Sequence, residues 1–274
     1  MSVAVVAEPV VQHPEAVATY PVTLRRAVVS EWIKFRTLRS SGAVLGGAVF
    51  GMVAIALLVG YNIRHVGPSL QADDLAASGP MQGYYLGQLL IGSLGVLFVS
   101  GEYSTGMIRS TMTAAPKRIP VVWAKLIVFV AVTAATMILV SVIAFISAQA
   151  LIAQYRTGFS LADPGVPRVV IGTGVYLTLA GVIGAAIGWI VRRTPGALVA
   201  YFAIIVVLPV LFANALGTWG KDVAQVLPGA AGRTFVSSIR EPHTLSPWLG
   251  LLVLLAWAVS GLTVAVITLK RRDV

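Results

Sequence analysis

The residues able to do chemistry are few in this chain, and they form no catalytic set. The histidines His13, His65 and His243 lie far apart and lack the spacing typical of metal ligands. The stretch "GTWGKD" at 217–222 lacks the G-x-x-x-x-G-K-[ST] spacing that cradles phosphates. No Ser/His/Asp set or acid pair suggests nucleophilic or acid–base catalysis. We therefore expect no enzyme active site, no metal site and no cofactor site here.

One polar segment interrupts the apolar sequence. Residues 101–118, "GEYSTGMIRSTMTAAPKR", contain one acid, three bases and five hydroxyl side chains besides Tyr103. Ser104 or Thr105 can cap a short helix, and Pro116 would end it. The apolar residues between them follow a helical stripe: Ile108, Met112 and Ala115. The spacing leaves two interpretations open: a helix that docks on a soluble partner, or a solvated loop whose bases only set orientation.

The composition indicates the class of protein to which this polar segment belongs. The chain has 274 residues, of which 57% are hydrophobic and only 11% are charged. Soluble domains have about 25% charged residues, so this chain has too few charges to cover a water-facing surface. The mean hydropathy is +0.88. We expect an all-α polytopic membrane protein, without disulfides because the chain has no cysteine.

Six apolar runs are long enough to cross a bilayer, which takes about 20 residues in a helix. Only Arg192, Arg193 and Thr194 separate the fourth run from the fifth, which predicts a tight hairpin. Pro209 lies inside the fifth run and predicts a kink there. The predicted spans are roughly 42–61, 82–101, 121–151, 169–191, 195–216 and 247–269.

Charge predicts the orientation of these spans. Fourteen of the 20 lysines and arginines fall on the side that holds both chain ends, residues 101–120 and the 192–194 turn. The positive-inside rule places this side in the cytoplasm. The net charge of +10 is then mostly an orientation signal, and we expect no nucleic-acid partner. Residues 1–22 have three prolines and no apolar core. We expect a disordered cytoplasmic tail there rather than a signal peptide.

A basic amphipathic helix is predicted just before the first span. Residues 23–39, "TLRRAVVSEWIKFRTLR", contain apolar side chains at helical spacing with bases around them. Such a helix lies in the headgroup layer and is attracted to anionic lipid. We therefore predict an interfacial elbow helix that joins the first span directly. Its apolar stripe consists of Leu24, Val28, Trp32, Phe35 and Leu38.

Small and polar residues inside the spans each allow two interpretations. Small residues at helical spacing predict either an oligomer interface or moving seam, or ordinary packing within one bundle. These residues are Ala43, Gly47, Gly51, Gly83, Gly87, Gly181, Gly184 and Gly188. Polar side chains either line a path or bond to their own or neighbouring helices. These are Gln88, Ser93, Thr133, Ser141, Ser147 and Thr178. No acid, lysine or histidine lies in the middle of a predicted span, which argues against a proton path through these helices.

Several stretches together resemble the ABC-2 type permeases, the membrane subunits of ABC transporters, in their small six-span actinobacterial-like form. "SEWIKFRTLRS" (30–40) is similar to the family's elbow, and residues 101–118 followed by "VVWAKL" (121–126) are similar to its first cytoplasmic loop. "GWIVRRTPGAL" (188–198) resembles the turn between the fourth and fifth spans. "LPGAAGRTF" (227–235) resembles the family's last outer loop, "LSPWLGLLVLLAW" (245–257) its last helix, and "KRRDV" (270–274) its basic tail.

The resemblance covers residues 23–274 and implies one transmembrane domain there. It implies a dimer with a second permease copy or a paralogous permease in the cytoplasmic membrane, and a separate ATPase subunit that binds ATP and Mg. It also implies export or extraction of a small hydrophobic or amphipathic substrate, and short re-entrant helices within 223–239. The ATPase-coupling surface implied by position consists of Glu102, Tyr103, Ser104, Thr105, Gly106, Ile108 and Arg109, with Arg192 and Arg193 as a second contact.

Two other classes of protein compete with this interpretation. One is a polytopic membrane interaction protein, such as a regulatory or immunity factor, that has no transport cycle. The other is a membrane-embedded enzyme, which the lack of a catalytic set disfavours.

The predicted orientation can be tested by cysteine labelling, because the chain has no cysteine of its own. We expect Ala72→Cys and Gly229→Cys to react with an impermeant maleimide from outside intact cells. We expect Thr113→Cys to react only after permeabilisation. The reverse pattern would overturn the orientation.

Overall fold

The computed structural model describes residues 23–65, 76–107, 118–155, 157–238 and 244–271, and every regular element within these ranges is helical. Six helices there are long and apolar enough to cross a membrane, which confirms the all-α class and the six predicted spans. Their number and composition are compatible with a multi-pass membrane protein. The six are Arg39–Asn62, Ala76–Ser104, Ile119–Ile152, Val166–Val191, Thr194–Ala215 and Pro247–Arg271.

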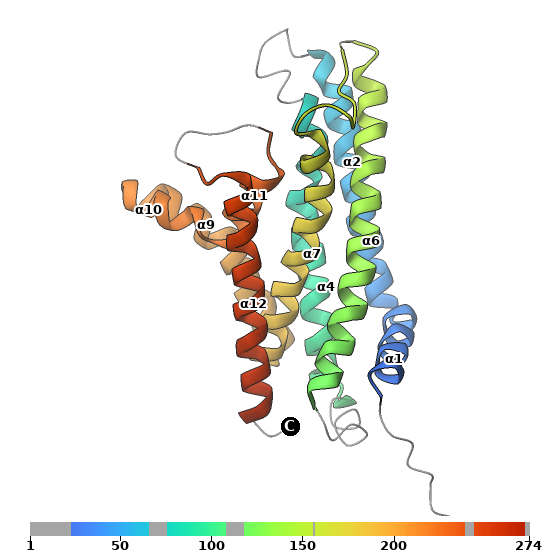
Figure 1. The fold of residues 1–274 in the computed structure, drawn as a ribbon, viewed down its shortest axis with the longest axis vertical. Helices are drawn as coiled ribbons and strands as arrows, with labels where there is room; N and C mark the ends of the chain where they lie inside the picture. The colour runs from blue at the N-terminus through green and yellow to red at the C-terminus, as the bar shows by residue number, and fades with distance from the viewer. Residues whose placement is uncertain (1–22, 66–75, 108–117, 156, 239–243, 272–274) are drawn as a thin grey trace, which may run out of the picture.

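The helices run up and down along one long axis (Figure 1). One end of the bundle holds α1, the ends of α4 and α12 and the start of α6, and we call it the α1 end. The first part of the chain forms α1 (Leu24–Thr37), α2 (Arg39–Asn62), η1 (Ile63–His65), η2 (Gly79–Gly83) and α4 (Tyr84–Ser104). The second part forms α6 (Arg118–Ile152), α7 (Val166–Val191), α8 (Thr194–Phe202), η3 (Ala203–Val207), α9 (Leu208–Ala215), α10 (Gly217–Gln225), α11 (Pro228–Val236) and α12 (Pro247–Arg271).

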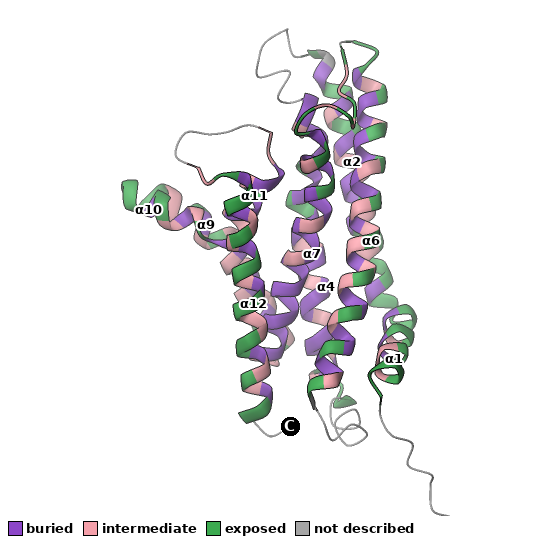
Figure 2. Ribbon diagram, in the orientation of Figure 1, coloured by how far each residue is buried: buried purple, intermediate pink, exposed green. Residues whose placement is uncertain are grey.

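The centre of the bundle is the pair α4 and α7, which are buried along most of their length (Figure 2). Their backbones touch because glycines face each other across the contact. A Cβ added at Gly95 would lie 2.0 Å from the carbonyl oxygen of Gly181, and one added at Gly184 would lie 2.2 Å from that of Gly92. Only glycine leaves room for such close helix packing.

Most of the predicted small residues therefore pack within this chain. A Cβ at Gly83 would lie 2.9 Å from the Cα of Met52, and Gly51 faces Leu86, so α2 packs on η2 and α4 in the same way. Ala43 and Gly47, by contrast, are exposed at the start of the α2 stripe. Several of the predicted polar side chains bond to their own helix: Thr133 to Phe129, Ser147 to Ile143 and Thr178 to Gly174.

The fifth span is interrupted, as Pro209 predicts. Proline lacks the N–H that would bond to the carbonyl of Ile205 one turn earlier, and its ring would clash with that carbonyl. The helix responds with a π-helical turn, η3, immediately before α9. In Figure 1, α9 and α10 diverge from the bundle, whereas α12 runs along it.

Two short helices, α10 and α11, occupy most of the segment in which the resemblance implied re-entrant helices. The helix α11 packs against α7 and α12, and its Ala231, Gly232 and Phe235 are buried. The close approach is visible at Gly232, where a Cβ would lie 1.9 Å from the Tyr176 ring of α7.

A separate helix, α1, occupies most of residues 23–39 and ends at an extended residue, Leu38, before α2 begins. Its inward face carries Glu31 and Phe35, which are buried, whereas Trp32 and Leu38 of the predicted stripe are exposed. Leu24 is also exposed, and Val28 is half-buried. Only Phe35 of the predicted apolar stripe is therefore buried against the rest of the chain.

The α4–α7 contact makes a specific prediction about stability. We expect Gly184→Ala to lower the free energy of unfolding by about 1–3 kcal/mol, because its methyl group would collide with a backbone carbonyl that cannot move aside. The matched control is Gly46→Ala on α2, where no atom lies within 4 Å of the added Cβ. Thermal unfolding in detergent compares the two variants, and equal stability would contradict this packing.

Candidate functional site

Four charged side chains form a closed ring at the α1 end of the bundle, which we call the charge ring. Lys34 Nζ lies 2.7 Å from Glu31 Oε1 and 2.9 Å from Glu102 Oε1. Lys125 Nζ lies 2.6 Å from Glu31 Oε2 and 3.0 Å from Glu102 Oε1. Each base thus contacts both acids, and the ring joins α1, α4 and α6 with no net charge.

The charge ring is mostly closed to solvent. The side chains of Glu31, Glu102 and Lys125 are 3%, 9% and 4% exposed, and that of Lys34 is 20% exposed. Phenylalanines from three helices shield one side: the Phe98 ring contacts those of Phe35 and Phe129, and Lys125 Nζ lies 4.2 Å from the Phe98 centroid. The ring therefore lies in a medium that penalises any unpaired charge.

The electrostatics of Lys34 reflect the two carboxylates beside it. Burial alone would lower the pKa of this ammonium, but its hydrogen bonds to Glu31 and Glu102 outweigh that effect and hold the pKa above its ordinary value. Lys34 therefore stays charged throughout the physiological pH range. Because the raised pKa favours the folded state at all pH values below it, this contribution is lost only in strongly alkaline solution.

Three members of the charge ring, Glu31, Lys34 and Lys125, carried a signal in the sequence that our interpretation did not use. Glu31 and Lys34 are three residues apart on one helix, a spacing at which side chains meet. Lys125 lies inside the predicted third span, where an isolated charge calls for a partner. We counted all three only as orientation markers. The pairing between helices, across 23 to 94 residues, could not be predicted from the sequence.

The predicted coupling surface is placed in part by the structure. Glu102 is buried in the charge ring, whereas Ser104, Thr105 and Gly106 are exposed beyond it. The hydroxyls of Ser104 and Thr105 both donate to the carbonyl of Gly101 and finish α4. Ile108 and Arg109, with most of the short helix predicted to run from the Ser104 or Thr105 cap to Pro116, lie outside the described residues. The surface as a whole stays a prediction.

Arg192 and Tyr103 of the predicted surface are brought together. Arg192 ends α7 in the left-handed conformation, with φ of 61°. Its guanidinium carbon lies 5.4 Å from the centre of the Tyr103 ring, and one of its nitrogens donates to the carbonyl of Thr268 at 3.4 Å. Arg193 is exposed beside it. The α7–α8 turn thus lies next to the end of α4, where Ser100 also bonds to Thr194 at 2.9 Å.

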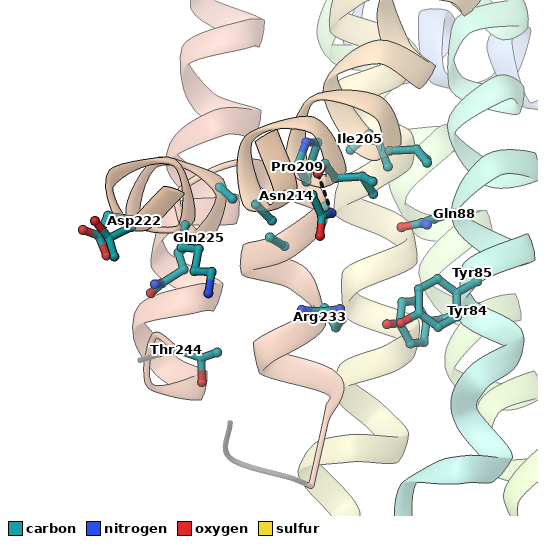
Figure 3. Close-up of a pocket in the computed structure, with 18 residues that line it drawn as sticks. Tyr84, Tyr85, Gln88, Ile205, Pro209, Asn214, Asp222, Gln225, Arg233 and Thr244 are labelled. Atoms are coloured by element: carbon teal, nitrogen blue, oxygen red, sulfur yellow. Dashed lines mark hydrogen bonds between the residues drawn. The ribbon is translucent and has the colours of Figure 1, made fainter. Parts of the chain in front are cut away.

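A cavity of about 810 Å³ lies on the opposite part of α4. Tyr84, Tyr85 and Gln88 of α4 line one side, and residues of η3, α9, α10 and α11 line the other (Figure 3). Gln88 is held in place, because Tyr176 donates to its side-chain oxygen and Tyr201 donates to its backbone carbonyl at 2.7 Å. The volume falls within the range of about 300–1,000 Å³ typical of small-molecule sites.

The π-helical turn helps to shape this cavity. The Ile205 carbonyl, which Pro209 leaves without its usual helical partner, faces Gly229 at the start of α11. A Cβ at Gly229 would lie only 1.9 Å from that oxygen.

The same close contact makes Gly229→Cys a poor choice for labelling. Exposed Thr157, between α6 and α7, replaces it as the expected outer site in the orientation experiment.

Comparison with known proteins adds no relative. No model of a known protein family matches the chain, and a search of curated proteins finds no match either. Within the described part of the chain, no group of three or more His, Asp or Glu side chains could hold a metal ion. The candidate sites are therefore the charge ring and the cavity, and both are defined by the geometry above.

The charge ring makes a prediction about stability. We expect Lys125→Met to lower the free energy of unfolding by about 3–5 kcal/mol, because Lys34 alone would face two buried carboxylates. The double variant Lys125→Met/Glu102→Gln restores neutrality and should recover part of that loss. Thermal unfolding in detergent is the measurement, with the exposed Lys270→Met on α12 as a charge-matched control. A single variant as stable as this control would contradict the ring.

Proposed function

We propose that this chain is the membrane-spanning permease subunit of an ABC transporter. In this proposal it pairs with a second permease and with a separate ATPase subunit that binds ATP and Mg. The complex exports or extracts a small hydrophobic or amphipathic substrate across the cytoplasmic membrane, with both ends of the chain in the cytoplasm. The order of the sequence stretches that resemble ABC-2 permeases, together with the six apolar helices, supports the proposal.

The observation that carries the proposal is that one helix joins the two candidate sites. The helix α4 has 21 residues and is about 30 Å long. Glu102 at one end belongs to the charge ring, and Tyr84, Tyr85 and Gln88 at the other end line the cavity. A transporter needs a rigid connection of this kind, because force applied by a soluble partner must reach the substrate site.

The charge ring gives α1 a role in this connection. It ties α1 to α4 and α6, so these elements move together if α1 is displaced. The outward side of α1 presents Val29, Trp32 and Ile33, each at least 46% exposed, next to basic residues. These side chains suit an elbow in the lipid headgroup layer, and the inward acid–base face suits a lever on the bundle.

The exposed residues beyond the charge ring suit contact with an ATPase. Ser104, Thr105, Gly106 and Arg193 are exposed at the same end of the bundle, on neighbouring elements. Glu102, which the resemblance places on the same surface, instead supports these residues from inside. Its replacement would therefore change stability as well as coupling.

The proposal is tested by purification from native membranes. We expect the tagged chain to bring down an ATP-hydrolysing subunit in equal amount. We expect Arg193→Ala to weaken that association by roughly tenfold, as the loss of a favourable interface residue does. Lys270→Ala, an exposed base at the same end, is the control and should keep wild-type association. If no ATP-binding chain accompanies the wild-type protein, the non-transporting membrane interaction protein becomes the better interpretation.

A further inference from the structure

A second, smaller cavity of about 240 Å³ adjoins the large one. The two share four lining residues, namely Tyr84, Tyr85, Arg233 and Thr244. The smaller cavity is otherwise lined by four polar residues and three apolar ones, namely Ser78, Gln82, Thr234, Ser237, Val236, Leu245 and Pro247. It is therefore a chamber of mixed polarity that adjoins the larger cavity.

The interior of the larger cavity has a different character. Where η3 and α9 line it, five of the six side chains are apolar, namely Ile205, Val206, Pro209, Val210 and Ala213, and the sixth is Asn214. Of the apolar ones, Ile205 and Pro209 are buried. The joined cavities thus offer a mostly apolar compartment on one side and a compartment of mixed polarity on the other.

The junction between the two compartments carries a positive charge. Arg233 of α11 lines both cavities and lies near enough to Tyr84 to interact with it electrostatically. Figure 3 shows its side chain between the tyrosine pair of α4 and Gln225 of α10. Among the described lining residues, the other charged ones are Lys221 and Asp222 of α10, which are adjacent and opposite in sign. Within the described part of the chain, Arg233 is therefore the charged residue that the two cavities share.

We propose that the joined cavities bind an anionic amphiphile, with its phosphate, sulfate or carboxylate head at Arg233 and its apolar tail against η3 and α9. A guanidinium suits such a head because it presents a planar fork of donors that matches an oxyanion in two hydrogen bonds. The hydroxyl side chains of Thr244 and Tyr85 line both cavities beside it. That this amphiphile is the cargo rests on the proposed transport function, whereas its binding does not.

Binding is tested on the full chain in nanodiscs of zwitterionic phosphatidylcholine, without any ATPase. Three fluorescently tagged probes of equal chain length are compared by polarisation: dodecyl phosphate, dodecylphosphocholine and dodecanol. We expect the wild-type chain to bind dodecyl phosphate at least about tenfold more tightly than the other two, as a charge-assisted hydrogen bond allows.

Two variants separate the head site from the tail site. Arg233→Gln should remove the preference for dodecyl phosphate and leave dodecanol binding unchanged. Lys221→Gln removes a charge from the same cavity away from the junction and should keep the preference. Ala213→Trp fills the apolar compartment and should weaken the binding of all three probes. Each variant is accepted only if it elutes as a single species like the wild-type chain.

The outcomes are distinct from those of the transport test. Equal affinity for the three probes, or an equal loss of preference in Arg233→Gln and Lys221→Gln, overturns the proposal even if an ATPase co-purifies. A measured preference stands even if none does. Nanodiscs containing phosphatidylglycerol identify the source of the amphiphile: competition with dodecyl phosphate indicates a membrane lipid, and no competition indicates an amphiphile from solution.

Discussion

The closed ring of Glu31, Lys34, Glu102 and Lys125 is the interaction on which the rest of the structure depends. Each carboxylate would be costly to bury alone, and the negative charge of each is balanced by two ammonium groups within 3.0 Å. The ring fixes α1 against α4 and α6, and α4 packs backbone to backbone on α7 through glycines. Together these contacts make one continuous, rigid connection from the α1 end to the cavity.

The cavity exists because the fifth span departs from regular helix. Pro209 removes a helical hydrogen bond, and the helix forms a π-helical turn just before it. Beyond that turn, α9 and α10 diverge from the bundle. Gly229 lets α11 approach the freed Ile205 carbonyl, so the cavity has a defined wall rather than a loose gap. An interrupted fifth span thus faces the closely packed α4–α7 pair across the cavity.

Much of the fold could be predicted from the sequence because bilayer thickness sets helix length and the apolar runs are long. The kink at Pro209 and the glycine packing followed from the chemistry of single residues. The charge ring could not be predicted, because which charges pair depends on how distant helices are placed. The same reason explains why the inward contact of α1 through Glu31 and Phe35 could not be predicted. The cavity, with Arg233 at its junction, likewise requires five elements to be placed at once.

The measurement that tests the central claim most directly is a spin-label distance across the cavity, between Gln82→Cys on η2 and Thr218→Cys on α10. Both positions are exposed, and the chain has no other cysteine. In the chain reconstituted with the ATPase subunit that we propose as its partner, the account predicts that ATP changes this distance, and that Lys125→Met abolishes the change. A distance that does not respond to ATP, or that responds equally without the charge ring, would contradict the account.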